Sequence, residues 1–262
     1  MGKIITLTTD FGLQDHYVSA MKAVMLGIAP NAQLVDISHE IPPQDIMAGA
    51  WGIRNTAFLF PKNSIHLVVV DPGVGTDRNP IALEVNNQVF VGPDNGIFSL
   101  FFEEFTYKAY KLNNPNYWRG IRSRTFHGRD LFSPIAAHLA KGVGLEELGD
   151  PISDLVSYHW AVPIGDKDGL QGWVIHIDRF GNLITNISEE LIENTIGRRK
   201  VRIYVGNTMI DHLVNTFEDV APGEPAAFVG SSGMMEIGIN RGNAAEMLSV
   251  DKGTQISLVL QK

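Results

Sequence analysis

The chain has 262 residues, of which 44% are hydrophobic and 19% are charged, so it can form one large or two smaller folded domains and is not a disordered protein. Its net charge of −8 argues against nucleic acid and anionic membranes as partners, because both attract clustered Lys and Arg. The absence of cysteine excludes disulfides, thiolate nucleophiles and sulfur-ligated metals. With no apolar run near the roughly 18 residues of a membrane span and no signal-peptide core, we expect a cytoplasmic protein.

The amino-terminal part of the chain alternates between apolar β-branched runs and amphipathic stretches. These patterns predict strands at 4–9, 33–37 and 65–70, separated by helices at 15–28 and 45–58. Such alternation indicates parallel strands joined by right-handed crossovers. We therefore expect a layered α/β domain with a mainly parallel sheet.

The pattern changes after this alternation. Asn86-Asn87 separates two short apolar runs and predicts a tight hairpin between them. The elements expected in this part are strands at 81–85 and 89–91, a short aromatic helix at 97–105, a strand at 107–112 and a helix at 131–141.

The last third of the chain is typical of a β-rich domain. From Gly169 onward, short apolar stretches are separated by FGN, PGEP and DKG, with one brief helix at 189–195. A small barrel or sandwich of about 95 residues is expected. We therefore predict an α/β domain at 1–160 and a β-barrel domain at 161–262.

The stretch IHLVVVDPGVGTDR, residues 65–78, places a carboxylate at the end of a buried strand. Asp71 closes the strand, Gly73 and Gly75 allow a tight turn, and Arg78 adds a cation. Open α/β sheets bind ligands beyond the carboxyl ends of their strands, so Asp71 and Arg78 are candidate site residues. The alternative is a structural Asp in a turn, with Arg78 as its partner in a surface ion pair.

Two further acids, Asp10 and Asp94, also lie at or just past predicted strand ends and are followed closely by glycine. Each alone is compatible with an ordinary turn. Three such acids in the first hundred residues favour a polar pocket at the ligand-binding edge of the sheet.

The run TFHGRD brings His127, Arg129 and Asp130 to the start of a predicted helix. A histidine beside glycine is accessible to a small substrate and suits proton transfer near neutral pH. The alternative is that Asp130 caps the helix, Arg129 is solvated and His127 packs in the loop.

Short polar groups with free backbone amides recur in the carboxyl-terminal domain. HIDRFGN places Asp178 at a strand end with Asn182 across a turn, and VGSSG places Ser231 and Ser232 in a glycine-flanked loop. Both motifs suit a zwitterionic or nucleoside ligand, and both also suit ordinary hairpins.

Evidence for other known sites is weak or absent. His16, His39, His66 and His127 show no HxxxH or HExxH spacing, and no acidic run has the calcium-loop pattern. No dinucleotide fingerprint, P-loop or nucleophile elbow occurs. We expect no metal and no cofactor.

Taken in order, seven motifs resemble the S-adenosyl-L-methionine (SAM) hydrolases that form adenosine, also called SAM hydroxide adenosyltransferases, which are related to fluorinating and chlorinating adenosyl transferases. The resemblance covers essentially the whole chain. It implies an α/β domain followed by a β-barrel, in a homotrimer whose sites lie at subunit interfaces. The motifs are TTDFG, HEIPPQD, VVVDPGVGTDR, GPDNG, TFHGRD, IDRFGN and VGSSG followed by INRGNAAE.

The resemblance also implies roles for individual residues. The set that handles water in these hydrolases matches Asp71, Arg78 and His127. The halide-using relatives lack this set, since Tyr matches His127, and in the fluorinating enzymes Ser matches Gly128. The resemblance implies that Asp10 binds the ribose hydroxyls, and that Asp178 and Ser231 bind the amino and carboxylate ends of methionine. It also implies that Asn182 binds the adenine and that the backbone from Arg241 to Asn243 contacts the adenine edge. The halide enzymes carry Arg on the methionine carboxylate where Ser232 stands here.

The expected reaction is hydrolysis of SAM to adenosine and L-methionine by in-line attack of water or hydroxide at C5′. Because the sulfonium departs as a neutral thioether, no acid is needed at the leaving group. Either Asp71 or His127 can take the proton, with Arg78 keeping the carboxylate ionised. The alternatives are a halide-dependent adenosyl transferase, disfavoured by His127 and Gly128, a non-catalytic adenosine- or SAM-binding module, and metal-dependent hydrolysis of another substrate.

Overall fold

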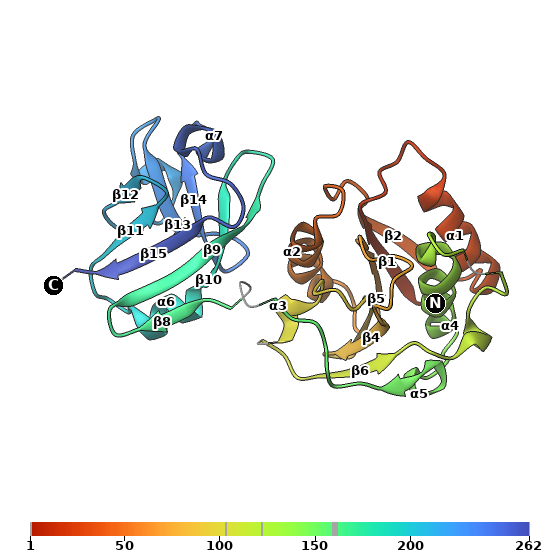
Figure 1. Cartoon of the computed structure of the whole chain (residues 1–262). Helices are drawn as coiled ribbons and strands as arrows, with labels where there is room; N and C mark the ends of the chain where they lie inside the picture. The colour runs from red at the N-terminus through yellow and green to blue at the C-terminus, as the bar shows by residue number, and fades with distance from the viewer. Residues whose placement is uncertain (1, 103, 122, 159–161, 262) are drawn as a thin grey trace. The chain divides into compact units, whose positions relative to one another are not determined.

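The computed structural model describes residues 2–102, 104–121, 123–158 and 162–261. The chain divides into two compact units, Met1–Ser157 and Tyr158–Lys262 (Figure 1). Each unit encloses its own apolar core. The first unit is a mixed α/β domain and the second is a β-rich, barrel-like domain. The predicted fold class is therefore confirmed. No described helix has the length and apolarity needed to cross a bilayer.

The first unit is built on a seven-stranded sheet in the order β2-β1-β3-β5-β4-β6-β7. Strands β2, β1, β3 and β5 are parallel, whereas β4, β6 and β7 pair antiparallel. All five residues of β3 are buried, as expected for a strand covered on both faces. The strands are β1 (Ile4–Thr9), β2 (Gln33–Ser38), β3 (Ile65–Val69), β4 (Pro80–Val85), β5 (Gln88–Pro93), β6 (Tyr107–Lys111) and β7 (Asp150–Pro151).

Helices cover both faces of this sheet. The α2 helix lies on one face, and α1 and α4 pack together on the other (Figure 1). Asp45 caps α2, because its carboxylate Oδ1 accepts a hydrogen bond from Ala48 N at 2.9 Å. The α-helices are α1 (Tyr17–Ile28), α2 (Ile46–Thr56), α3 (Ser99–Phe102), α4 (Ser133–Ala140) and α5 (Leu145–Leu148), with 3₁₀ turns at Ala57–Leu59 and Pro115–Tyr117.

The hairpin predicted at Asn86-Asn87 is confirmed. Asn86 and Asn87 adopt φ values of 50° and 61°, and Val85 of β4 pairs with Gln88 of β5. Two consecutive left-handed residues give the turn whose twist matches that of the flanking strands. This hairpin reverses the chain and makes the sheet mixed.

The helix predicted at 131–141 begins differently. A π-helical turn, Gly128–Phe132, precedes α4, and Asp130 lies inside that turn. The Asp130 side chain is fully buried and accepts hydrogen bonds from Arg119, Arg129 and the Ser123 amide, so the cap and the solvated Arg129 considered from the sequence are both wrong. The aromatic helix predicted at 97–105 is shorter, as α3, and position 103 lies outside the described residues.

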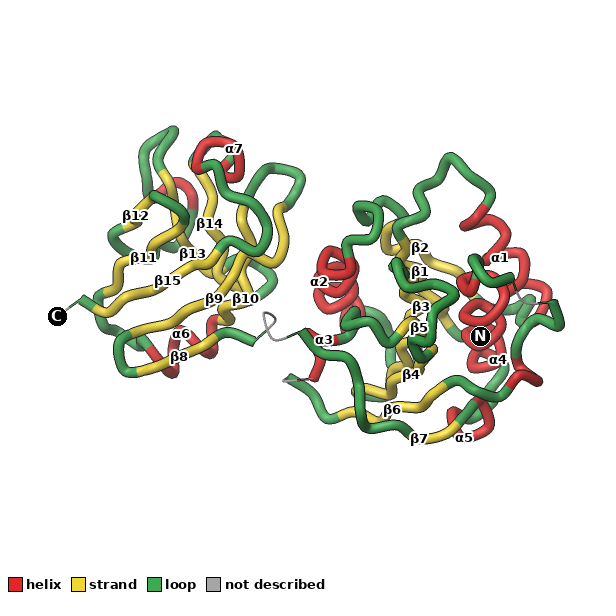
Figure 2. The backbone as a smooth tube through the Cα atoms, in the orientation of Figure 1, coloured by secondary structure: helices red, strands yellow, loops and turns green. Residues whose placement is uncertain are grey.

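The second unit is dominated by strands (Figure 2). Its eight-stranded sheet runs β12-β11-β15-β9-β10-β14-β13, with β8 paired to β9, and every strand pair is antiparallel. A bridge between Leu213 and Ala227 links the segment after β12 to β13, which nearly closes the barrel. The elements are β8 (Ile164–Asp166), β9 (Gly169–Ile177), β10 (Leu183–Ser188), α6 (Glu189–Thr195), β11 (Val201–Val205), β12 (Thr208–Ile210), a 3₁₀ turn (Phe217–Asp219), β13 (Pro225–Val229), β14 (Met234–Ile239), α7 (Ala244–Leu248) and β15 (Gln255–Leu260).

Candidate functional site

Asp10 and Asp71 leave the first sheet at the same edge. They follow β1 and β3, which are parallel neighbours with Thr9 paired to Val69. Burial raises the pKa of Asp10; a hydrogen bond from the Gln44 amide, 2.8 Å from Oδ2, opposes this shift, and the nearby charge of Asp71 adds to it. Two carboxylates that repel each other at the carboxyl edge form a polar centre of the kind that α/β sheets use for ligands.

Asp94, the third acid at a strand end, has different neighbours. Its side chain is buried, and Oδ1 accepts a hydrogen bond from Val156 N at 3.0 Å. Burial raises the pKa of Asp94, and the nearby negative charge of Asp154 raises it further. Asp94 therefore holds the segment that ends the first unit.

Arg78 joins Asp71 to His127. The Arg78 Nε atom lies 3.0 and 3.1 Å from the two Asp71 oxygens, its Nη2 donates to Oδ2, and the same Nη2 lies 2.9 Å from His127 Nδ1. The Arg78 and Asp71 side chains are only 9% and 4% exposed. This pair is buried, so the alternative of a surface ion pair is wrong.

The contact with Arg78 also sets the tautomer of His127. A guanidinium can only donate, so Nδ1 must accept, and the proton of the neutral ring lies on Nε2. His127 can then donate a hydrogen bond through Nε2. Its ring is held near a fixed positive charge, in a residue that is 8% exposed.

The turn that carries Asp71 and Arg78 is held by its own backbone. Val74 N donates to Asp71 O, and Thr76 donates to Gly73 O through its amide and its hydroxyl. Gly75 has φ +82°, and a Cβ at this position would lie 2.6 Å from Arg124 O. Glycine is therefore required here by both conformation and space.

In the second unit, Asp178 and Asn182 bind each other across the turn after β9. Asp178 Oδ1 accepts from Phe180 N at 2.8 Å and from Asn182 N at 2.9 Å, and Oδ2 accepts from Asn182 Nδ2 at 2.9 Å. These bonds form an Asx-type turn. They support the hairpin interpretation of the motif and still leave one acceptor site, on Oδ2, for a ligand.

The turn containing Arg241 lies against the Asp178 turn. A Cβ on Gly181, which has φ +84°, would lie 1.9 Å from Asn243 Oδ1, and Ala245 N donates to Gly181 O at 3.0 Å. Arg241 is exposed and has φ +60°. The structure therefore brings Asp178, Asn182 and the 241–243 turn together.

Ser231 lies in the loop between β13 and β14, and Glu236 lies close to both this loop and Asp178. A Cβ on Gly230 would lie 1.9 Å from Glu236 Oε1, while burial and the nearby Asp178 charge raise the pKa of Glu236. Glu236 was not predicted from the sequence. The available signal was an acid between Met235 and Ile237, two buried residues of β14.

The histidines considered as metal ligands have other contacts. His39 Nδ1 lies 2.8 Å from Thr9 Oγ1 and its Nε2 lies 3.0 Å from Asp36, while His66 Nδ1 lies 2.8 Å from Thr6 Oγ1. Among the described residues, no group of three or more His, Cys, Asp or Glu could hold a metal ion.

The fold and the site define a two-domain protein in which a buried carboxylate, guanidinium and imidazole meet at the edge of an α/β sheet. The chain matches the SAM hydroxide adenosyltransferase N-terminal domain over residues 5–149 and the C-terminal domain of that family over residues 172–257. It belongs to this family.

Similar proteins span almost the whole chain. A protein of Thermus thermophilus named (R)-S-adenosyl-L-methionine hydrolase is 36% identical, over 96% of this chain and 97% of its own length. One of Salinispora arenicola with the same name is 37% identical, over 96% of both. The crystal structure of an uncharacterized conserved protein from Thermotoga maritima has a TM-score of 0.88 and 36% identity, covering 97% of this chain and 99% of that one. A more distant relative from Actinoplanes, 27% identical, is named fluorinase.

Proposed function

We propose that this chain hydrolyses SAM to adenosine and L-methionine. The observation that carries the proposal is the buried contact of Arg78 with both Asp71 and His127, at the sheet edge beside Asp10. Relatives of 36–37% identity that bear the name of a SAM hydrolase support it. The proposed site contains a cation, a carboxylate and an N–H donor, which together can hold and deprotonate a water molecule.

The proposed chemistry is a substitution at C5′ of the ribose. A water or hydroxide oxygen forms a bond to C5′ while the C5′–S bond breaks, and sulfur takes the electron pair to become the neutral thioether of methionine. His127 Nε2–H donates to the nucleophilic oxygen, and Arg78 orients the Asp71 carboxylate through its hydrogen bonds. The Nδ1 contact occupies the basic nitrogen of His127, so it favours Asp71 as the group that takes the proton.

We also propose substrate contacts in both units. Asp10 accepts hydrogen bonds from the ribose hydroxyls, since an ionised carboxylate has only acceptors. Asp178 and Ser231 bind the methionine amino and carboxylate ends, Asn182 binds the adenine, and the backbone at Arg241 contacts the adenine edge. The proximity of the Asp178, Asn182 and Arg241 turns supports one shared binding surface on the second unit.

The assembly we propose is a homotrimer in the cytoplasm, with sites at subunit interfaces. The support is the family resemblance, together with the fact that the proposed substrate contacts come from both units of the chain. Light scattering should give about three times the 28.8 kDa chain mass. A monomer mass at the concentration of an active assay would contradict the trimer.

The experiment that tests the function uses SAM in ¹⁸O-labelled water. Attack at C5′ places one ¹⁸O in the 5′-hydroxyl of adenosine and none in methionine, and mass spectrometry of the separated products measures both. Intact SAM after long incubation with excess protein would refute the proposal. Unlabelled adenosine would refute attack by water at C5′.

Two added conditions separate the alternatives. A halide-dependent transferase would form a chlorinated nucleoside only when chloride is present, whereas the hydrolase forms adenosine at an unchanged rate in its absence. A metal-dependent hydrolase would lose activity in excess chelator. Tight, saturable adenosine binding without turnover would favour a binding module.

A further inference from the structure

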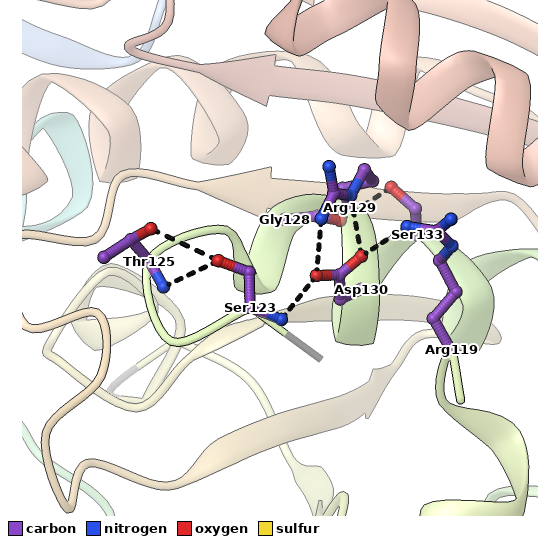
Figure 3. A network of polar contacts seen from close by, with 7 residues as sticks. All are labelled: Arg119, Ser123, Thr125, Gly128, Arg129, Asp130 and Ser133. Atoms are coloured by element: carbon purple, nitrogen blue, oxygen red, sulfur yellow. Dashed lines mark hydrogen bonds and ion pairs between the residues drawn. The ribbon is translucent and has the colours of Figure 1, made fainter. Parts of the chain in front are cut away.

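A π-helical turn carries the candidate histidine into the site. His127 directly precedes this turn, Gly128–Phe132, and the Ser133 amide donates to Gly128 O five residues earlier. The Ser133 hydroxyl donates to the same carbonyl at 2.7 Å (Figure 3). Single π-helical turns are rare and are frequently found at functional sites, which directs attention to what stabilises this one.

The register of the turn matters for Arg78. His127 and Phe132 are five residues apart, yet both contact this guanidinium: Nη2 lies 2.9 Å from His127 Nδ1, and Cζ lies 5.2 Å from the centre of the Phe132 ring. In an α-helix, residues five apart lie about 140° apart around the axis. The wider turn is what allows both side chains to face Arg78.

Asp130, inside the same turn, is a fully buried carboxylate with four hydrogen bonds (Figure 3). Its Oδ1 accepts from Arg119 Nη1 at 3.0 Å and Arg129 Nε at 2.7 Å, and its Oδ2 accepts from Arg129 Nη2 at 2.8 Å and Ser123 N at 2.7 Å. Burial acts to raise the pKa of Asp130, but the bonds from Arg129, Ser123 and Arg119 lower it to about 2. The carboxylate is therefore charged at neutral pH.

These bonds connect the π-helical turn to the other half of the site. Arg119 N also donates to Asp130 O at 2.9 Å, so Asp130 holds this loop through main chain and side chain. The same loop contacts the turn of Asp71 and Arg78, because Arg124 O packs directly against Gly75. Asp130 thus links the element that carries His127 to the element that carries Arg78.

We propose that Asp130 is a positioning residue that locks the π-helical register and so keeps His127 Nδ1 against Arg78. Its effect on turnover rests on the proposed function, whereas its effect on the position of His127 does not. Without the carboxylate, Arg119 and Arg129 lose their common acceptor, and the turn can relax toward α-helical register. That change rotates His127 away from Arg78.

The test starts from Asp130→Asn, which preserves shape and removes charge. We expect kcat for SAM to fall about 100-fold, as a displacement of about 1 Å can cost that much, while KM changes by less than about threefold. A crystal structure or imidazole NMR of the variant should show that the contact between His127 and Arg78 is lost. This second readout needs no turnover, so it stands even if the wild-type protein does not hydrolyse SAM.

A matched control separates positioning from loss of stability. Gln88 is buried at the start of β5, at the opposite end of that strand from the site, and its Nε2 donates to three main-chain carbonyls. Gln88→Ala should lower the unfolding temperature and leave kcat unchanged. Equal losses of kcat in Gln88→Ala and Asp130→Asn would overturn the positioning role.

Arg119 allows a rescue experiment if Asp130→Asn fails to fold. Its side chain is 48% exposed, so Arg119→Ala opens the buried carboxylate to small cations from solvent. Added guanidinium at millimolar concentration should restore part of the lost kcat, and sodium at equal ionic strength should not. An Arg119→Ala variant with wild-type kcat, or an Asp130→Asn structure with the His127–Arg78 contact intact, would overturn the proposal.

Discussion

Arg78 is the residue on which the geometry of the first unit depends. It donates to both oxygens of Asp71 and to His127, and its guanidinium packs over Phe132. A planar guanidinium makes such divergent contacts because its donors point in fixed directions. Lysine offers one compact ammonium and cannot reproduce them, so an exchange of Arg78 for lysine is not conservative.

Exchange of the proposed water-holding residues should separate turnover from binding. We expect Asp71→Asn and His127→Ala to lower kcat by about 10² to 10⁴ while SAM still binds, because they remove a proton acceptor and a donor to the nucleophile. Asp10→Ala should mainly weaken SAM binding, because it removes the proposed ribose contact. Single-turnover kinetics and calorimetric titration measure the two effects. Equal loss of binding in all three variants would contradict these roles.

His66 should make stability depend on pH. It is fully buried, with Nδ1 2.8 Å from Thr6 Oγ1 and Nε2 3.2 Å from Gln88 Oε1, and burial lowers its pKa from 6.5 to about 4. The unfolded chain therefore binds this proton more readily than the folded one, and stability falls as pH falls from 6.5 toward 4. Between pH 7.5 and pH 5 the loss from this group is about 2 kcal/mol.

Urea unfolding of the wild-type protein and of His66→Gln over this pH range measures the effect. The variant lacks the titrating ring. Between pH 7.5 and pH 5 its unfolding free energy should therefore fall by about 2 kcal/mol less than that of the wild-type protein. Subtracting the two curves removes the contribution of the carboxyl groups, which both proteins share. Parallel curves would show that His66 does not cause the pH dependence.

At the scale of elements, exchange of Gly75 tests whether turnover depends on the close approach of the turn from Asp71 to Arg78 and the loop that contains Arg124. Gly75→Ala places a methyl group 2.6 Å from Arg124 O at φ +82°, so the turn from Asp71 to Arg78 must shift. Gly142→Ala is the matched control, because Gly142 has φ +97° in the same unit but nothing within 4 Å of the added Cβ. Both variants should lose about 1–2 kcal/mol of stability, because a Cβ is disfavoured in the left-handed region, but only Gly75→Ala should lose kcat, by about tenfold or more. Similar kcat values in both variants would show that this contact is unimportant.

The elements that the sequence predicts well are those with strong local signals. Apolar runs bounded by acids and glycines marked β1, β3 and β5, and Asn86-Asn87 marked the hairpin between β4 and β5. The π-helical turn carried no such signal. Asp130 resembled a helix cap because it is a short acid before an apolar run, and its two arginine partners depend on the fold of the loop around Arg119.

The candidate site follows the same division. Asp71 and Arg78 are seven residues apart and could be paired from the sequence, because one turn holds both. The contact between Arg78 and His127 spans 49 residues and needs the packing of separate elements. The sequence does not indicate Glu236 as a site residue, because a polar residue between buried ones in a strand is typical of a solvent-facing side chain.

At the scale of the whole molecule, each unit has its own core and its own set of proposed substrate contacts. The first unit offers Asp10, Asp71 and His127, and the second offers the turns at 178–182 and 241–243. The adenosine and methionine parts of SAM differ in chemistry, and the residues proposed to bind them lie in partly different segments of the chain. Segment-resolved measurements can therefore test whether both units contact SAM, as proposed.

Bound SAM should slow amide hydrogen exchange in both units of the Asp71→Asn variant, which we expect to bind SAM without rapid turnover. Protection should appear in peptides covering residues 10–12, 178–182 and 230–233, because ligand contacts stabilise the local closed state. Adenosine alone should protect 10–12 and 178–182, whereas methionine alone should protect 178–182 and 230–233, because Asp178 is the proposed contact of its amino group. The basic segment 198–202, for which no substrate contact is proposed, is the internal control. Protection confined to one unit at saturating SAM would contradict a site assembled from both.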